Sequence, residues 1–80
     1  FEYANVDSLL KMFDMHEIEA KSLVEQKLSL PAYDQCLKAS HVFNILDARG
    51  AISVAQRAGY IGRIRDITKA AAGIWLDSQS

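Results

Sequence analysis

The sequence predicts a small all-α domain: three helices in a bundle-like arrangement with short connections. Apolar residues recur at the three- and four-residue spacing of amphipathic helices through three long stretches. Half of the 80 residues are apolar, with only four glycines and one proline, which is typical of a globular chain. Because 80 residues make at most one domain, we expect helices over about 6–27, 31–46 and 54–76 to share one core.

The first predicted helix, residues 6–27, carries an apolar stripe along one side. Asn5 or Asp7 is the expected N-cap, since both side chains accept hydrogen bonds from a helix start. Met15 and Ile18 lie off the stripe, and they indicate either a second contact surface or scattered surface apolarity. The stripe itself consists of Val6, Leu9, Leu10, Phe13, Ala20, Leu23 and Val24.

The second predicted helix, residues 31–46, begins at Pro31, because proline suits a first helical turn. Its apolar residues lie on both sides, which is typical of a central helix between two neighbours. We interpret Cys36 as a small core residue. As the only cysteine it allows no internal disulfide, and with just two histidines, His16 and His41, a structural zinc site is not expected. One face carries Tyr33, Cys36, Leu37, Ser40 and Phe43, and the other carries Val42 and Ile45.

A short connection leads to the third predicted helix, residues 54–76. Gly50 is placed to end the preceding helix in the left-handed conformation. Ser53 and Gln56 have the spacing of a capping box, in which each side chain bonds the other's backbone amide. The apolar side of this helix is expected to hold Val54, Tyr60, Ile61, Ile64, Ile67, Ala71, Ile74 and Trp75.

Arg57 projects into that apolar side, and a buried arginine needs a carboxylate. We therefore expect a structural ion pair between Asp47 and Arg57 across the connection, with Arg49 or Glu17 as competing partners.

Three glycines, Gly59, Gly62 and Gly73, project onto the polar side of the third helix. Two interpretations stay open: a smooth face that another backbone approaches closely, or tolerant surface positions.

The net charge of −1 conceals an asymmetry. Residues 1–34 hold three lysines against seven acids, whereas residues 35–80 hold six bases against three acids. A basic segment attracts phosphate, although an ordinary solvated helix face has the same composition. No aromatic residues are expected where RNA bases would stack.

Several classes of protein are excluded. No run of about 18 uncharged apolar residues occurs, which excludes a membrane span. Phosphate-binding loops, dinucleotide fingerprints, zinc-protease motifs and nucleophile elbows are all missing, so no catalytic residue is predicted. Because the first residue is Phe1 and not methionine, we expect residues 1–80 to be part of a longer chain.

Four blocks of the sequence are familiar in their order and spacing: residues 1–7, 30–33, 43–54, and the positions Arg57, 60–61, 63–65 and 68–70. Together they resemble the C-terminal helical region of the alpha subunit of bacterial glycyl-tRNA synthetase. The resemblance covers nearly the whole chain, and its most specific block is 43–54.

This resemblance implies a parent that is a class II aminoacyl-tRNA synthetase, or glycine–tRNA ligase, acting in the cytoplasm. Such an enzyme activates glycine with ATP and magnesium and transfers it to tRNA, as an α2β2 assembly of two alpha and two beta subunits. The motifs that hold ATP, glycine and the acceptor end precede this region in the family. The resemblance therefore implies no catalytic residue and no cofactor within residues 1–80, which alone are expected to be inactive.

Residues that match the family pattern are then candidates for fold or contact roles. For Ser53 and Tyr60 we favour the fold, as cap and core. Ala58, Gly59 and Gly62 depart from the family, where bulkier or charged residues are common, so the glycine face is not a family requirement. Contacts with the beta subunit, the catalytic core or tRNA phosphate are open for Arg49, Arg63, Arg65 and Lys69.

Three functional hypotheses follow. In the first, the segment is a non-catalytic helical domain that supports the catalytic core and alpha/beta assembly. In the second, the basic third helix contacts tRNA phosphates. In the third, the chain is a helical adaptor unrelated to translation.

Overall fold

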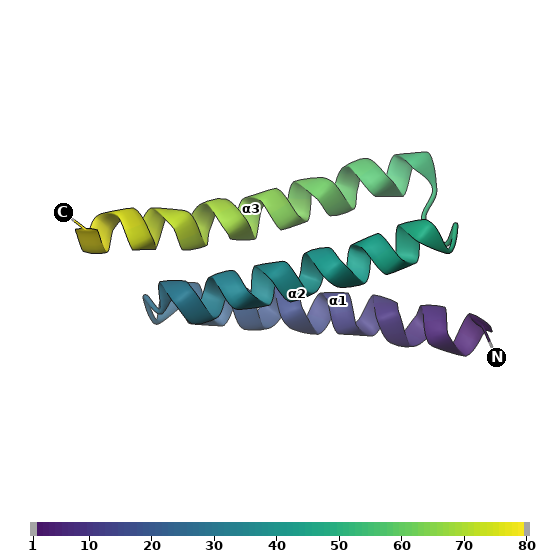
Figure 1. Ribbon diagram of the computed structural model, residues 1–80, viewed down its shortest axis with the longest axis horizontal. Helices are drawn as coiled ribbons and strands as arrows, with labels where there is room; N and C mark the ends of the chain where they lie inside the picture. The colour runs from purple at the N-terminus through teal and green to yellow at the C-terminus, as the bar shows by residue number, and fades with distance from the viewer. Residues whose placement is uncertain (1, 80) are drawn as a thin grey trace.

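Three α-helices follow one another along the chain and lie side by side (Figure 1). The computed structural model describes the backbone of residues 2–79 and the side chains of residues 6–77. The helices are α1 (Glu2–Glu25), α2 (Ser29–Ala48) and α3 (Val54–Gln79). The central helix α2 runs antiparallel to both α1 and α3, so α1 and α3 point the same way (Figure 1). The predicted all-α, three-helix fold is confirmed.

Helix α1 begins four residues earlier than predicted, at Glu2, so neither Asn5 nor Asp7 is its N-cap. Both lie inside the helix because neither proline nor glycine interrupts residues 2–7. Asp7 instead forms an ion pair with Lys11 one turn further along, at 3.7 Å.

The end of α1 falls at Glu25, two residues before the predicted one, because Lys27 adopts a left-handed conformation with φ of 61°. The amide of Lys27 donates to the carbonyl of Val24 and that of Leu28 to the carbonyl of Leu23, each at 2.9 Å. This pair of bonds is a Schellman motif, in which the left-handed position is most often glycine. Because this position holds lysine and not glycine, the end of α1 could not be recognised from the sequence.

Helix α2 begins at Ser29, so Pro31 is its third residue and still within the first turn. Its other end, at Ala48, is a second Schellman motif. Gly50 has a φ of 69°, as the sequence predicted, and its amide donates to Asp47 at 3.0 Å. The amide of Ala51 donates to Leu46, also at 3.0 Å.

The start of α3 is the predicted capping box. The Ser53 amide donates to Gln56 Oε1 at 3.0 Å, and the Gln56 amide donates to Ser53 Oγ at 3.1 Å. The helix continues three residues beyond the predicted end, to Gln79, because residues 77–79 hold no helix-breaking residue.

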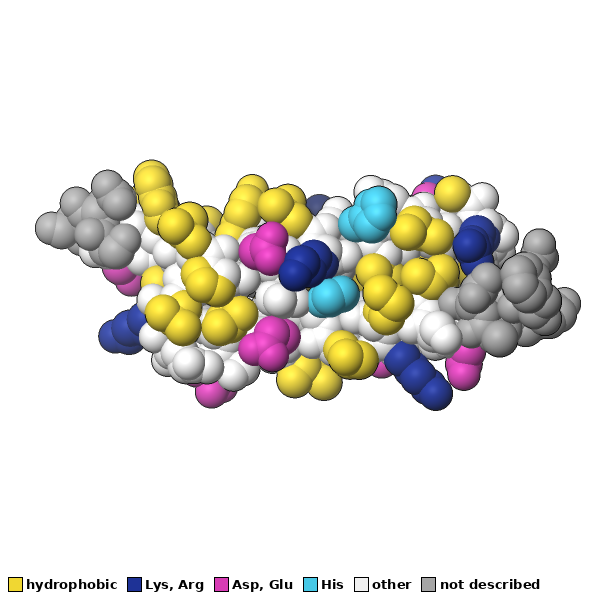
Figure 2. Space-filling model, turned by 60° about the horizontal axis from the view of Figure 1, so that its bottom comes forward, with side chains coloured by type: hydrophobic (Ala, Val, Ile, Leu, Met, Phe, Trp, Pro, Cys, Tyr) yellow, Lys and Arg dark blue, Asp and Glu magenta, His cyan; other side chains and the backbone are white. Residues whose placement is uncertain are grey.

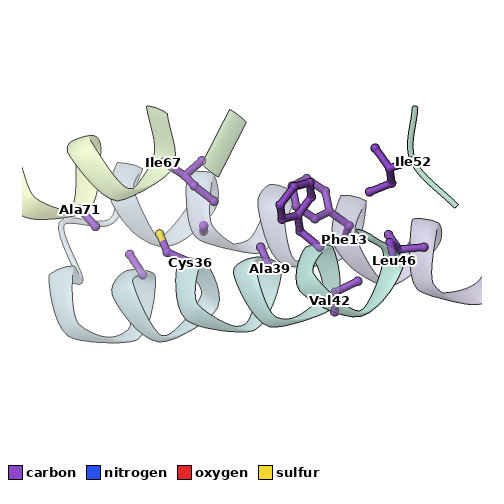
Figure 3. Packing of buried hydrophobic residues seen from close by; sticks show 11 residues of the cluster. Phe13, Cys36, Ala39, Val42, Leu46, Ile52, Ile67 and Ala71 are labelled. Atoms are coloured by element: carbon purple, nitrogen blue, oxygen red, sulfur yellow. The ribbon is translucent and has the colours of Figure 1, made fainter. Parts of the chain in front are cut away.

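The core is a narrow line of mostly small side chains with the rings of Phe13 and Phe43 among them (Figure 3). Phe13 of α1 and Leu46 of α2 are its largest fully buried side chains. Alanines and Cys36 fill most of the rest, so the helices approach closely while burying little volume. The cluster comprises Phe13, Ala20, Ala32, Cys36, Ala39, Val42, Phe43, Leu46, Ile52, Ile67 and Ala71.

The outer parts of the predicted stripes are only partly covered. Val54 is 85% exposed and Trp75 46%, although both were expected on the apolar side of α3. Tyr33 and Leu37 of α2 are likewise exposed. The apolar surface of α2 and α3 is therefore wider than the contact between these two helices.

Candidate functional site

A charged cluster joins α1 to α3 through Arg63. Its guanidinium forms a bidentate ion pair with Glu17. Nε donates to Oε2 at 2.9 Å, and Nη2 donates to Oε1 at 2.6 Å. Nη2 also donates to Asp14 Oδ1 at 2.8 Å. Both carboxylates come from adjacent turns of α1, and such paired geometry is among the stronger side-chain contacts.

Two aromatic rings lie beneath the same guanidinium. The Arg63 Cζ is 4.8 Å from the ring centre of Phe13 and 5.1 Å from that of Tyr60. The two rings meet edge to face at 4.8 Å, and Phe43 of α2 stands 6.1 Å from Tyr60. All three helices thus contribute to one aromatic–cationic cluster, and Tyr60 has the core role expected of it.

The cluster shifts the ionisation of its members. The hydrogen bond from Arg63 holds the pKa of Glu17 below its usual value, although desolvation opposes this effect. The same hydrogen bond raises the pKa of Arg63 further. Arg63 was a candidate for contact with RNA or another subunit, but its charge is already neutralised within the bundle.

The structure brings Asp47 and Arg57 together across the connection between α2 and α3. Arg57 Nη2 and Nε donate to Asp47 Oδ1 at 2.6 and 3.1 Å. The expectation that Arg57 is buried is wrong, because its side chain is 50% exposed. It lies in the first turn of α3, and from there it extends back over the connection and not into the core.

The remaining candidates, Arg49, Arg65 and Lys69, are exposed. Arg65 and Lys69 lie one turn apart on α3, whereas Arg49 caps the far end of α2. Among residues 6–77, none of the three has an ion-pair partner within 4.0 Å. The structure therefore pairs Arg57 and Arg63 internally and leaves these three cations for solvent or a partner.

An apolar cleft lies between the N-terminal part of α2 and the C-terminal part of α3, with a volume of about 240 Å³. Most of its lining is apolar, and its lining residues carry three polar side-chain groups: the hydroxyls of Ser29 and Tyr33 and the indole N–H of Trp75. The lining residues are Ser29, Leu30, Tyr33, Ala71, Ala72 and Trp75. This cleft was not predicted from the sequence, because its two aromatic residues are 42 positions apart.

The cleft belongs to a larger apolar surface at the same end of the molecule. Figure 2 shows hydrophobic side chains gathered toward the left, the end at which α2 begins and α3 finishes in Figure 1. A band of charged and histidine side chains separates them from a second hydrophobic group. The exposed large apolar residues of this end are Leu28, Leu30, Tyr33, Trp75 and Leu76.

His16 and Cys36 both make contacts that join one helix to another. His16 Nδ1 bonds Gln35 Oε1 at 2.7 Å and joins α1 to α2. Burial raises the pKa of the Cys36 thiol, and a hydrogen bond with Thr68 of α3 opposes this rise in part.

Within residues 6–77, no three His, Cys, Asp or Glu side chains are grouped to hold a metal ion. None of the helices described here is long and apolar enough to cross a membrane.

One comparison with known proteins bears on these observations. A protein-family model described as glycyl-tRNA synthetase alpha subunit matches residues 1–80.

Proposed function

The chain belongs to the glycyl-tRNA synthetase alpha subunit family, and from this premise we propose that it is a non-catalytic helical region of a larger alpha subunit. Its role is to join that subunit to the beta subunit and to support the catalytic core. The parent enzyme is a glycine–tRNA ligase of class II that works in the cytoplasm as an α2β2 assembly. Membership of this family excludes the alternative of a helical adaptor unrelated to translation.

The observation that carries this proposal is the exposed apolar surface around the α2–α3 cleft. Five large apolar residues, each at least 43% exposed, gather where α2 begins and α3 finishes. Large exposed apolar patches are uncommon on monomeric proteins and mark interaction sites. In a family whose alpha subunit has a beta counterpart, this surface is the natural place for subunit contact.

The described residues do not fit a nucleotide or its magnesium ion. A magnesium–phosphate site needs carboxylates and cations that converge on one point. Here the carboxylates of the charged cluster are bound by Arg63, and the cleft is lined almost entirely by apolar side chains. We therefore place ATP and magnesium binding in the parent outside residues 6–77, and no chemical step is assigned to this region.

The test is a titration of the purified beta subunit with two forms of the alpha subunit, one intact and one lacking residues 1–80. We expect the truncated form to lose most of its affinity for beta while its circular dichroism shows that the remainder stays folded. Undiminished binding by the folded, truncated form would refute the proposal.

A second candidate function, contact with tRNA, is favoured by one observation. Tyr33 and Trp75, both half-exposed, line the same cleft. Arg65 and Lys69, which have no ion-pair partner among residues 6–77, precede the lining residue Ala72 on α3 by two turns and one turn. Aromatic rings beside cations are the usual platform for single-stranded RNA. Charge reversal at both cations should then raise the KM for tRNA, and an unchanged KM would exclude this role.

A further inference from the structure

We propose that the α2–α3 cleft receives an amphipathic helix of the beta subunit, whose apolar anchors are flanked by Asp and Glu side chains. This inference rests on the proposed role in subunit assembly and specifies the surface and the chemistry of the partner segment.

The dimensions of the cleft favour protruding side chains as its occupant. Pockets for small molecules usually measure about 300–1,000 Å³ and carry several polar groups that orient the ligand. This cleft, at about 240 Å³, is smaller, and apart from the polar groups of Ser29, Tyr33 and Trp75 its lining is apolar. It fits one or two aliphatic or aromatic side chains from a partner helix, the mode in which a groove takes anchors at helical spacing.

Helix α3 presents a mixed stripe along the edge of the cleft. Arg65, Lys69, Ala72 and Leu76 follow at i, i+4, i+7 and i+11, so they lie on one side of the helix. All four are exposed, and Ala72 lines the cleft itself. The stripe therefore passes from a basic half into an apolar half.

The charged residues of this stripe, Arg65 and Lys69, are both basic. Asp34, which follows the lining residue Tyr33, is bound to Lys38 at 3.2 Å. Asp66 of α3 lies around the helix on the side of Gly59 and Gly73, because these residues are seven positions apart.

Arg65 and Lys69, by contrast, have no ion-pair partner among residues 6–77. A partner complementary to this surface must supply carboxylates beside its apolar side chains.

The exposed area of the chain agrees with the size of such a contact. The accessible surface is 5466 Å², whereas a compact chain of 8.9 kDa is expected to expose about 4,800 Å². The excess of about 650 Å² approaches the roughly 800 Å² that each partner buries in a standard interface.

The same surface is less suited to RNA. Phosphate binding depends on several cations along one track. Arg57 and Arg63 are bound to carboxylates, and Arg49 lies at the opposite end of α2, which leaves only Arg65 and Lys69 along the stripe of α3.

The experiment measures the affinity of the purified beta subunit for full alpha subunits that carry single substitutions. Ala72→Glu places a carboxylate in the apolar cleft, and we expect at least about a tenfold weaker complex. Lys69→Glu should weaken it about three- to tenfold and flatten its dependence on salt, since a rim charge is lost. Lys69 is exposed, so this variant keeps the fold even if the first does not.

Two matched variants serve as controls. Ala58→Glu adds the same charge at another exposed alanine of α3, more than three turns from Ala72, and Arg49→Glu reverses an exposed arginine far from the cleft. Both should bind beta within about twofold of the unsubstituted subunit.

The outcomes separate this inference from the function on which it rests. If removal of residues 1–80 abolishes beta binding but Ala72→Glu and Lys69→Glu bind normally, the cleft proposal is wrong and the assembly role stands. If removal has no effect, both fail. Weaker tRNA affinity with unchanged beta binding would identify RNA as the occupant, and altered sedimentation of alpha alone would identify a second copy; either result overturns the proposal.

Discussion

Arg63 makes most of the polar contacts between α1 and α3. Its guanidinium is bound by Glu17 and Asp14 and covers the rings of Phe13 and Tyr60. The Glu17 side chain is only 12% exposed, whereas Arg63 is 38% exposed. In its degree of burial this ion pair is therefore intermediate between a buried pair and a surface pair. Its contribution to stability is modest.

The lowered pKa of Glu17 makes this contribution depend on pH. In the unfolded chain Glu17 ionises near its ordinary pKa of about 4.3. Because its folded pKa is lower, the pair stabilises the fold fully above that value and loses its effect as the pH falls through the folded pKa. At pH 7, Glu17→Gln should therefore reduce the free energy of unfolding by about 1 kcal/mol.

Urea denaturation of the 80-residue chain at pH 7 and pH 3 would check this. The difference between the unsubstituted chain and Glu17→Gln should shrink at pH 3. Glu19→Gln, at an exposed position on the same helix, should change stability by less than about 0.5 kcal/mol. Equal losses for Glu17→Gln at both pH values would show that the pair does not act through charge.

Lys27 holds a backbone conformation that costs a non-glycine residue about 1–2 kcal/mol. Lys27→Gly should therefore raise the free energy of unfolding by about 0.5–1 kcal/mol. Glycine removes the left-handed strain from the folded chain, and this gain exceeds the cost of the greater entropy of the unfolded chain. The matched variant Lys21→Gly, in the interior of α1, should lower it by about 1 kcal/mol. Denaturant titration measures both, and a destabilised Lys27→Gly would contradict the left-handed assignment.

At the scale of the helix, α3 carries three interior glycines that no tertiary contact requires. Apart from its chain neighbours and the nearby backbone of α3, a Cβ atom added at Gly59, Gly62 or Gly73 would meet no atom within 4 Å. We expect alanine at each of these positions to stabilise the chain by about 0.5–1 kcal/mol.

Gly50→Ala is the matched contrast, because its positive φ makes alanine strained although the space there is also open. It should be destabilising. Thermal unfolding of the four variants tests this account, and a lowered Tm for Gly59→Ala would argue against it. A higher Tm together with weaker beta binding would identify the glycine face as a docking surface.

Helix identity was predictable from local spacing, whereas helix ends and the site were not. The apolar stripes of α1 and α3 and the capping box of Ser53 and Gln56 depend on residues within a few positions. The stop at Lys27 lacked the glycine that usually marks it. The role of Arg63 depended on carboxylates 46 and 49 residues away, which periodicity does not place.

The cleft, like the contacts of Arg63, could not be predicted from local spacing. Tyr33 and Trp75 were each assigned to an apolar face, but their meeting at one edge depends on how α2 and α3 are paired. The prediction that no aromatic residues lie where RNA bases would stack was made one helix at a time, and it did not consider Tyr33 and Trp75 together.

At the scale of the whole molecule, the chain is elongated. It measures 48 × 21 × 14 Å with a radius of gyration of 13.5 Å, against about 11.6 Å for a compact chain of 80 residues. Three long helices with a core of mostly small residues form a thin layer with much of its surface exposed. Such a shape suits a region that is covered by other parts of an assembly.

The measurement that tests the central claim most directly compares two reactions of the assembled enzyme, with and without residues 1–80. Glycine-dependent ATP–pyrophosphate exchange reports activation, and aminoacylation reports transfer to tRNA. If the region acts mainly in assembly, as we propose, removal should leave exchange intact and abolish aminoacylation, because delivery of tRNA would then need the assembled subunits. Loss of exchange in a protein that stays folded and still binds beta would contradict the assembly role and leave support of the catalytic core as the role of the three helices.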